Sequence, residues 1–258
     1  MLSKIKIKKI NFLHTKKGRE KEQKFIAEGS KIVHELVKEG FVTEIFATSN
    51  FFHDFKKTYP TIKTEINLID EIEIKKISSL VNPSGVLAIC DFKVQQENSL
   101  TSIDKVSIFL DDIRDPGNLG TIIRLADWFG IKNIFCSLSS VDCYNSKVIQ
   151  ASMGSIGRVS VKYIDFEDFI RLYEGGEGIK IDLWAAVLNG ESIYDCKLPN
   201  NLVLVIGNES VGVSQEVINK ASKSISIPRS LTSETESLNA ASASAIILSE
   251  VFRKLNFL

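Results

Sequence analysis

From residue 106 onward, short apolar runs alternate with longer amphipathic segments. The runs are rich in Val, Ile and Leu and have the length of strands; they include VSIFL (106–110), NIFC (133–136) and NLVLVI (201–206). Segments with helical spacing separate them, over 119–129, 145–152, 165–173 and 214–222. This alternation is typical of a parallel sheet covered by helices on both faces. We therefore predict an α/β domain with a mostly parallel sheet that binds ligands at the carboxyl ends of its strands.

The first ninety or so residues predict a second, smaller α/β domain. Apolar residues recur at helical spacing from Arg19 to Glu39, which predicts one helix that ends at Gly40. Strands near 43–48, 66–68 and 85–92 and helices near 51–58 and 70–80 should follow. The polar stretch QQENSLTS (95–102) reads as a linker. We expect a substrate-binding domain over 1–95, a linker over 96–104 and a larger domain over 105–258.

Positive charge is concentrated at the start of the chain, although 32 Lys and Arg balance 32 Asp and Glu overall. Nine Lys or Arg residues stand between Met1 and Lys24, against two Glu. Such a segment fits the phosphates of a nucleic acid, and it equally fits a solvated basic terminus without a ligand. The candidates for phosphate contacts are Lys6, Lys8, Lys9, Lys16, Lys17 and Arg19.

The chain lacks the sequence features that several classes of protein require. Lys alternates with Ile from Met1 to Phe12, so no secretory signal is expected, and no apolar run reaches the ~18 residues of a membrane span. We therefore expect a cytoplasmic protein that does not enter a membrane. The four cysteines form no C-x-x-C pair, so no metal site is predicted. All three histidines precede residue 54, which excludes a Ser/His/Asp or Cys/His nucleophile built within the rest of the chain.

Three loops that follow predicted strands carry candidate site residues. DDIRDPGNLGTIIRLADWFG follows VSIFL and contains Asn118 in a glycine-lined turn and Arg124 on the next helix. GNESVGVS follows NLVLVI and places Glu209 at a strand end. RSLTSETESLNAAS follows SISIP and places Ser237 and Asn239 before the last helix.

Taken singly, each loop has an ordinary explanation. Asn118 could be a turn residue, Arg124 a surface cation and Ser237 a helix N-cap, and Gly-Asn turns are common. The chain contains neither G-x-x-x-x-G-K-[ST] nor G-x-G-x-x-G. A P-loop NTPase and a standard dinucleotide-binding domain therefore lose their main support.

Taken together, the loops resemble the motifs of a known family. D-P-G-N-L-G-T-I-I-R, then I-G-N-E-x-x-G-x-S, then I-P-R followed by E-S-L-N are similar in content and order to the three motifs of SpoU (TrmH-like) RNA ribose 2′-O-methyltransferases of the SPOUT superfamily. These motifs lie within about 106–255, and FIAEGSKIVHELVKEG and NPSGVLAI resemble the family's substrate-binding domain. The resemblance thus spans nearly the whole chain.

The resemblance implies a fold, an activity and an assembly. The larger domain would contain a deep trefoil knot, and the protein would be a homodimer with its active site at or near the subunit interface. The activity would be methyl transfer from S-adenosylmethionine to a ribose 2′-hydroxyl of rRNA or tRNA, without a metal ion.

The resemblance also assigns roles to individual residues. The cofactor-binding residues would be Val187, Leu188, Gly207, Ile227 and Leu238, and the catalytic residues would be Asn118, Arg124, Glu209, Ser237 and Asn239. Because arginine stays protonated, we expect Arg124 to bind phosphate and stabilise developing alkoxide charge. Asn118, Ser237 and Asn239 would position the ribose and Arg124 by hydrogen bonds, with Glu209 as an acceptor.

The last helix begins with small side chains, in SLNAASASAIILS (237–249). Ala and Ser permit a close approach of backbones that larger residues would block. We interpret this helix as one wall of the active site and part of the dimer interface.

The third motif departs from the family pattern. Ile227 and Ser237 are ten positions apart, more than is usual, no glycine lies between them, and Arg229 stands where an apolar residue is common. The cofactor loop could therefore differ in shape. This departure motivates an alternative, a catalytically inactive RNA-binding or ribosome-assembly protein of the same fold, and the intact Ser237-Leu238-Asn239 favours the enzyme.

Overall fold

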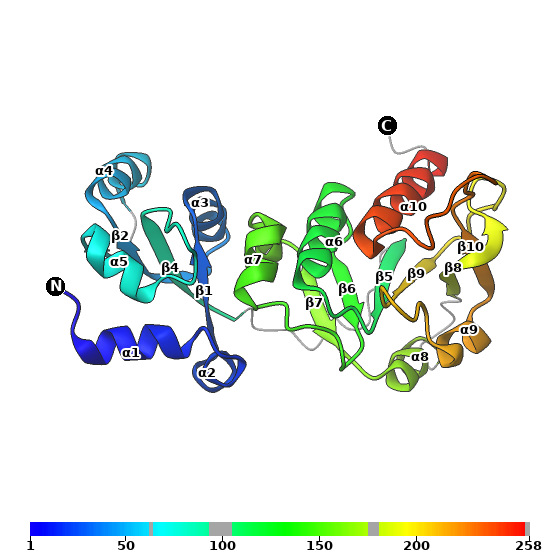
Figure 1. Ribbon diagram of the computed structural model, residues 1–258, viewed down its shortest axis with the longest axis horizontal. Helices are drawn as coiled ribbons and strands as arrows, with labels where there is room; N and C mark the ends of the chain where they lie inside the picture. Colours follow the sequence, from blue (N-terminus) through cyan, green and yellow to red (C-terminus); the bar gives the residue numbers. More distant parts are fainter. Residues whose placement is uncertain (62–63, 93–104, 175–180, 256–258) are drawn as a thin grey trace. The chain divides into compact units, whose positions relative to one another are not determined.

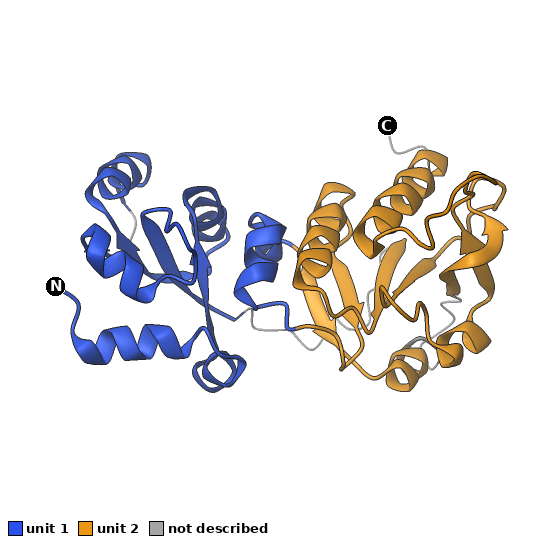
Figure 2. Ribbon diagram, viewed as in Figure 1, with its two compact units in different colours: residues 1–94, 142–158 blue, residues 95–141, 159–258 orange. Residues whose placement is uncertain are grey.

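The chain forms two compact units (Figure 2). The computed structural model describes residues 1–61, 64–92, 105–174 and 181–255. Unit 1 comprises residues 1–94 and 142–158, and unit 2 comprises 95–141 and 159–258. Segment 142–158 thus belongs to unit 1, although it lies inside the stretch predicted as the larger domain. The linker expected at 96–104 falls outside the described residues.

Unit 1 is a small α/β unit, as the sequence predicts (Figure 1). Its four-stranded sheet has the order β1-β4-β2-β3; β4 is antiparallel to β1 and β2, and β2 and β3 are parallel. Apolar residues of α1 and α5, among them Ile10 and Ile74, pack on this sheet. The elements are α1 (Lys4–Phe12), α2 (Lys16–Glu22), β1 (Lys24–Glu28), α3 (Ser30–Lys38), β2 (Val42–Ala47), α4 (Ser49–Thr58), β3 (Glu65–Leu68), α5 (Glu71–Ile77), β4 (Val86–Asp91), α7 (Ser146–Ser152) and the 3-10 helix η2 (Ser155–Gly157).

The single helix predicted from Arg19 to Glu39 is wrong, because β1 lies between α2 and α3. Gln23 ends α2 in a left-handed conformation with φ 53°, and Gly29, with φ 102°, precedes α3. Phe25, Ile26 and Ala27 between them are buried, and β1 pairs with β4 along its whole length. A short, continuous apolar run fits a buried strand as well as a helix, so periodicity alone did not separate the two.

Segment 142–158 is attached to unit 1 by aromatic stacking and by ion pairs. The Tyr144 ring stacks on Phe92 at 4.1 Å between ring centroids and on Phe25 at 4.7 Å. Arg158 Nη1 donates to Glu35 Oε2 on α3 at 2.7 Å. Gly154 lies so close to α3 that a Cβ there would come within 2.7 Å of the Glu35 Cβ. These contacts explain why the segment between β6 and β7 joins unit 1.

Unit 2 is built on a six-stranded sheet of order β10-β8-β9-β5-β6-β7, in which neighbouring strands run parallel. This confirms the predicted mostly parallel sheet, and the deep trefoil knot stays a prediction. The elements are β5 (Val106–Asp111), α6 (Pro116–Trp128), β6 (Asn133–Cys136), β7 (Ser160–Tyr163), α8 (Phe166–Glu174), β8 (Asp182–Ser192), β9 (Leu202–Gly207), α9 (Gln215–Lys220), β10 (Lys223–Ser226) and α10 (Ala240–Lys254).

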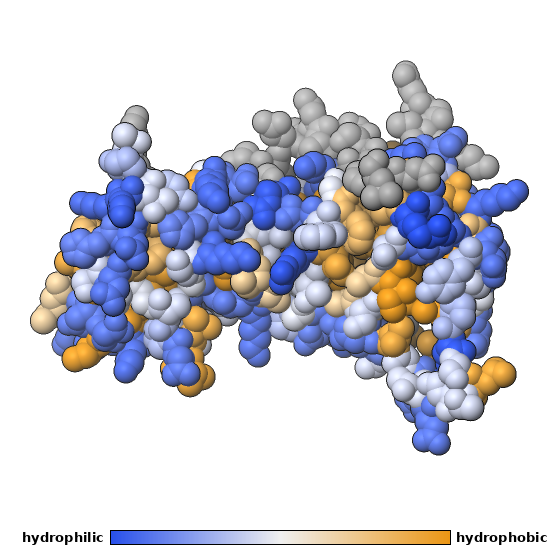
Figure 3. Space-filling model, turned by 90° about the horizontal axis from the view of Figure 1, so that it is seen from above, coloured by the Kyte–Doolittle hydropathy of each residue, from blue (hydrophilic) through white to orange (hydrophobic). Residues whose placement is uncertain are grey.

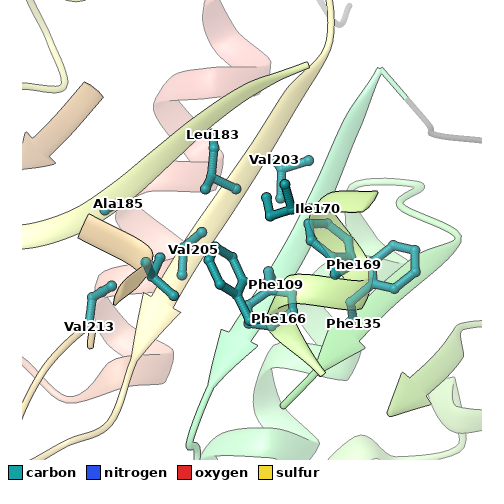
Figure 4. Packing of buried hydrophobic residues seen from close by; sticks show 11 residues of the cluster. Phe109, Phe135, Phe166, Phe169, Ile170, Leu183, Ala185, Val203, Val205 and Val213 are labelled. Carbon is teal, nitrogen blue, oxygen red and sulfur yellow. The ribbon is translucent and has the colours of Figure 1, made fainter. Parts of the chain in front are cut away.

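Helices cover both faces of this sheet, with α6 and α10 on one face and α8 and α9 on the other (Figure 1). On the second face, Phe109 and Phe135 of the strands pack against Phe166 and Phe169 of α8 (Figure 4). Val217 of α9 completes the same core. Because helices cover both faces of the sheet, a ligand can reach it at the carboxyl ends of the strands, where the connecting loops can form a site.

α10 is fixed at both ends. Near its start, the small residues Ala240, Ala241 and Ser244 are buried. Ser244 Oγ donates to the carbonyl of Ala240 at 2.7 Å. Near its end, Lys254 Nζ donates to the carbonyl oxygens of Ile193, Tyr194 and Cys196 at 2.7 to 2.8 Å. The loop after β8 is therefore held by the last helix.

Glu250, a buried residue of α10, is expected to stabilise the fold at neutral pH and to lose this effect in acid. Arg253 donates to both oxygens of Glu250, at 2.7 and 2.8 Å, and these bonds lower the pKa of Glu250 from 4.5 to about 2. A carboxyl group whose pKa is lower in the folded chain stabilises the fold above its unfolded pKa, and this contribution is lost as the pH falls toward 2. Urea unfolding at several pH values should show Glu250→Gln less stable than wild type at neutral pH. The difference should shrink between roughly pH 4.5 and 2, and a pH-independent difference would contradict this account.

Candidate active site

Asn118, Glu209 and Asn239 form a hydrogen-bonded chain in unit 2, which we call the amide relay. Asn118, in the first turn of α6, donates through Nδ2 to Glu209 Oε1 at 2.6 Å. Asn239 donates through Nδ2 to Asn118 Oδ1 at 2.7 Å. The three residues come from three separate loops and lie up to 121 positions apart in sequence. The structure thus brings together three of the five predicted catalytic residues.

The start of α10 fixes the direction of the amide relay. Asn239 is the N-cap, and its Oδ1 accepts from the backbone N–H of Ala241 and Ser242 at 2.9 and 3.2 Å. A cap needs an oxygen, so the NH2 group of Asn239 must face Asn118. Asn118 therefore presents its own oxygen to Asn239 and its NH2 group to the carboxylate of Glu209. The orientations of both amides in the relay therefore follow from the cap that Asn239 forms at one end and from the carboxylate of Glu209 at the other.

The loops that carry the relay are held by residues beside the predicted ones. Asp115 caps α6 and accepts from the backbone N–H of Asn118 at 2.8 Å. Asn208 donates to the carbonyl oxygen of Asp112 at 2.8 Å, and its Oδ1 accepts from the N–H of Ser210 and Val211. Asn208 therefore ties the loop after β9 to the loop after β5. The prediction of site residues omitted it, although its place directly after a strand, beside Glu209, was a usable signal.

Arg124 lies on α6 but outside the relay. It is six residues after Asn118, which corresponds to a rotation of about 600° and turns its side chain roughly 120° away from that of Asn118. Asn118 is buried, whereas Arg124 is exposed and makes no hydrogen bond to a described residue. Within one chain, the structure does not bring Arg124 to Asn118, Glu209 or Asn239.

Four of the five predicted cofactor residues lie on or directly after three neighbouring strands, β9, β8 and β10, and Leu238 directly precedes Asn239, the N-cap of α10. Gly207 ends β9, and Ile227 directly follows β10. Val187 and Leu188 lie in a bulge of β8, because β10 pairs with β8 through Ala185 and resumes only at Glu191. Leu188 and Leu238 are 66% and 47% exposed and offer apolar surface.

The β8 bulge is held close to β10 by a glycine and an ion pair. A Cβ on Gly190 would come within 2.7 Å of the backbone of Ser224 and Ile225. Lys223 Nζ donates to Glu191 Oε2 at 2.6 Å. This bond lowers the pKa of Glu191 and raises that of Lys223. The bulge is thereby fixed against β10.

The loop before α10 is longer than the family pattern and is bonded to itself. Arg229 Nη1 donates to the carbonyl oxygen of Thr235 at 3.2 Å, and the Ser230 and Thr232 hydroxyls lie 2.8 Å apart. Arg229 therefore has a local role where an apolar residue is usual. Ser237 is exposed and forms no hydrogen bond to a described residue. The alternative explanation of Ser237 as the N-cap of the last helix is wrong, because Asn239 holds that position.

Replacing Ser237 by alanine is therefore expected to leave thermal stability unchanged. Asn239→Ala, in contrast, removes the cap of α10 and should cost about 1 kcal/mol. Thermal unfolding of the two variants side by side makes the comparison. An equal loss of stability in both would mean that Ser237 contributes to the cap.

The predicted RNA-binding residues divide into exposed and buried groups. Lys8, Lys9, Lys16 and Lys17 are exposed on α1 and α2. Lys6 is half-buried and donates to Glu44 Oε2 at 2.5 Å.

Arg19 must be removed from this set, because only 4% of it is exposed. Its Nε and Nη2 donate to Asp142 Oδ2 at 3.0 and 2.7 Å, and its Nη1 donates to the carbonyl oxygens of Leu13 and His14. Its guanidinium group therefore stabilises unit 1 instead of facing a ligand.

The structure was also searched for metal ligands and membrane spans. The described residues contain no cluster of three His, Cys, Asp or Glu side chains placed to hold a metal ion. Within the same residues, no helix is both long and apolar enough to cross a membrane.

Known families match both parts of the chain. The model of the SpoU rRNA methylase family matches residues 105–249, and that of an MRM3-like substrate-binding domain matches residues 4–88. The amide relay and the β8 bulge lie within the first match.

Individual relatives extend the similarity over nearly the whole chain. The 23S rRNA (guanosine(2553)-2'-O)-methyltransferase of Bacillus subtilis is 29% identical over 246 residues, which cover 94% of each protein. A TrmH-family protein of Porphyromonas gingivalis is 33% identical, with a TM-score of 0.82, over 97% of this chain and 98% of its own. An S-adenosylmethionine-bound rRNA methyltransferase of Sinorhizobium meliloti is 27% identical, with a TM-score of 0.82, over 99% of this chain and 97% of its own. Because the family model matches more than half of its residues, the chain belongs to the SpoU rRNA methylase family.

Proposed function

We propose that this protein transfers a methyl group from S-adenosylmethionine to a ribose 2′-hydroxyl of rRNA or tRNA. The observation that carries the proposal is the amide relay of Asn239, Asn118 and Glu209 at the carboxyl edge of the parallel sheet. The names of the Bacillus subtilis and Sinorhizobium meliloti relatives support the reaction and the cofactor.

The strand ends of unit 2 fit S-adenosylmethionine. The β8 bulge presents backbone groups that can recognise an adenine edge, and the exposed side chains of Leu188 and Leu238 can cover its faces. Gly207 ends β9, the strand next to β8, and offers its backbone groups at that strand end. When bound, the cofactor supplies a methyl group on a positively charged sulfur.

The relay's own contribution is to fix the acceptor. Glu209 Oε1 is occupied by Asn118, and Oε2 accepts from no described residue. We infer that Oε2 accepts a hydrogen bond from a ribose hydroxyl and orients it. Because Asn118 holds the Glu209 carboxylate through Oε1, the carboxylate has little rotational freedom left to lose when it orients the hydroxyl. The 2′-oxygen that Glu209 orients would receive the methyl group of the bound cofactor, with the sulfur as leaving group, and the hydroxyl proton would pass to solvent.

We further propose that the protein acts as a homodimer in which α6 faces a second copy. Arg124 turns away from its own relay, and Trp128, one turn further along α6, is 82% exposed. Apolar side chains interspersed with hydrophilic ones also reach the surface of unit 2, at the right of Figure 3. A second copy would cover Trp128 and take Arg124 into its active site, where the guanidinium could stabilise the alkoxide charge that develops. Sedimentation equilibrium should give twice the mass of the chain, and a monomer that is active would contradict this arrangement.

The methylation assay tests the proposed reaction directly. The protein is incubated with methyl-labelled S-adenosylmethionine and with rRNA and tRNA from a strain that lacks it, and the RNA is digested to nucleosides. Label should appear in a 2′-O-methylnucleoside. Label only in methylated bases would overturn the proposal. RNA binding without transfer to any RNA would instead favour the inactive RNA-binding alternative.

A further inference from the structure

A cleft of about 460 Å³ opens in unit 2, and Glu209 is the one relay residue among those that line it. Its walls are the loop after β5, including Arg114, and the turn after β9 that runs from Asn208 to Val211. None of the residues assigned to the cofactor lies in it. Because Glu209 belongs both to the relay and to the cleft, whatever occupies the cleft lies next to the ribose that the relay would orient.

The cleft is built from backbone that is held in place. Asp112 has a left-handed conformation, with φ 58°, and its N–H donates to Ser137 Oγ at 2.8 Å. Asn208 bridges the two walls through the carbonyl oxygen of Asp112. Asn208 and Gly212 exchange two backbone hydrogen bonds, at 2.9 and 3.0 Å, which close the turn opposite. The shape of the cleft therefore exists before a ligand arrives.

Arg114 is the cation of this cleft, and its binding groups are available. Its side chain is 72% exposed, and its Nε donates to Asp112 Oδ1 at 3.0 Å. Its two terminal amino groups donate to no described residue. The bond from Nε orients the planar guanidinium group and leaves both terminal amino groups to bind two phosphate oxygens.

The carboxylates that surround Arg114 already have donors. Asp115 accepts from the backbone N–H of Asn118, and Asp112 accepts from Asn208 and from Arg114 itself. Glu209 accepts from the Asn118 side chain through Oε1, and its Oε2 is the oxygen that we assign to the ribose hydroxyl. The turn after β9 adds apolar surface, because Val211 is 80% exposed. A cation beside an apolar side chain suits a nucleotide, whose phosphate is charged and whose sugar and base have apolar faces.

We propose that this cleft binds the RNA nucleotide next to the one that is methylated. Arg114 binds its phosphate, and Val211 contacts its sugar or base. The inference rests on the proposed function, since it takes RNA as the substrate. It makes Arg114 a residue that selects and holds the RNA strand while taking no part in bond formation.

The test compares Arg114→Ala with Arg171→Ala. Arg171, on α8, is a matched control: its side chain is also 72% exposed, and it donates to Asp168 Oδ1 at 2.9 Å, three residues away. KM and kcat for methyl-accepting rRNA are measured between roughly 50 and 200 mM salt, and RNA binding is measured by filter retention in the same buffers.

Arg114→Ala should raise KM for RNA and weaken RNA binding roughly 10-fold with kcat within about twofold of wild type, because one charge-assisted contact is lost. It should also lower the slope of log affinity against log salt by about one unit. Arg114→Lys keeps the charge and should restore the salt slope but only part of the affinity. Arg171→Ala should behave as wild type.

Two results would overturn the inference. One is an Arg114→Ala protein whose RNA affinity and salt slope equal those of Arg171→Ala; the other is a fall in kcat alone, which would place Arg114 among the groups that position Glu209. A wild-type protein that methylates no RNA would overturn the proposed function instead. The filter-retention data then still decide whether Arg114 binds RNA.

Discussion

Replacing Asn118 by alanine is expected to slow methyl transfer roughly 100-fold or more while S-adenosylmethionine binding stays within about twofold of wild type. The alanine removes the middle of the amide relay and leaves Glu209 without the donor that lies 2.6 Å from it. Glu209 can then rotate, so the ribose hydroxyl is no longer held in line with the methyl group. Single-turnover methylation and calorimetric titration of the cofactor measure the two quantities separately.

The substitution Asn239→Asp tests the relay separately from the helix cap. Aspartate caps a helix as well as asparagine does, so α10 should keep its stability. It has no amide donor, however, so it repels Asn118 Oδ1, which the Asn239 amide contacts at 2.7 Å. We expect a loss of activity near that of the Asn118 variant with an unchanged melting temperature. Full activity in Asn239→Asp would show that the relay is not needed for transfer.

Replacing Gly207 by alanine is expected to destabilise unit 2 severely. The added Cβ would lie 2.2 Å from the backbone nitrogen of Val213 and 2.3 Å from the backbone carbon of Gly212. Backbone atoms cannot rotate away as a side chain can, so the end of β9 or the turn after it must shift. We expect a loss of about 3 kcal/mol or more in the free energy of unfolding, at or beyond the upper end for overpacked sites. Urea unfolding followed by circular dichroism measures it.

Gly212 provides the control for this second prediction. A Cβ there would meet nothing within 4 Å, but its φ of 75° strains any other residue. Gly212→Ala should therefore cost only about 1–2 kcal/mol. If both alanine variants unfold at the same urea concentration, the close approach of backbone at Gly207 is not what requires glycine. The predicted cofactor contact would then be the better explanation.

Most elements of unit 2 could be predicted because each has a clear period and clear boundaries. NIFC is confirmed as β6, residue for residue, and the strand expected at 106–110 is β5 at 106–111. The failure over Arg19 to Glu39 has the opposite cause. There a buried three-residue run sits between two short helices, and its strand character is fixed by pairing with β4 more than sixty residues later.

The site was predictable only as a set of residue types at strand ends. Sequence motifs point to Asn118, Glu209 and Asn239, but not to which amide donates, since that follows from the cap of α10. Arg19 was misjudged because its partner Asp142 lies 123 residues away. A count of charges along the sequence includes every arginine, but only the fold shows whether an arginine is exposed to solvent or buried against an aspartate.

Because segment 142–158 belongs to unit 1, the protein cannot be cut into its two units at a single point in the sequence. A fragment that starts at residue 105 would contain every predicted catalytic residue, yet it would also carry Tyr144 without Phe25 and Phe92 and Asp142 without Arg19. Such a fragment would expose an aromatic ring and an unpaired carboxylate that the whole chain covers. The two units are thus poor building blocks for domain exchange, and a chimera that takes its first unit from a relative should take residues 142–158 from the same donor.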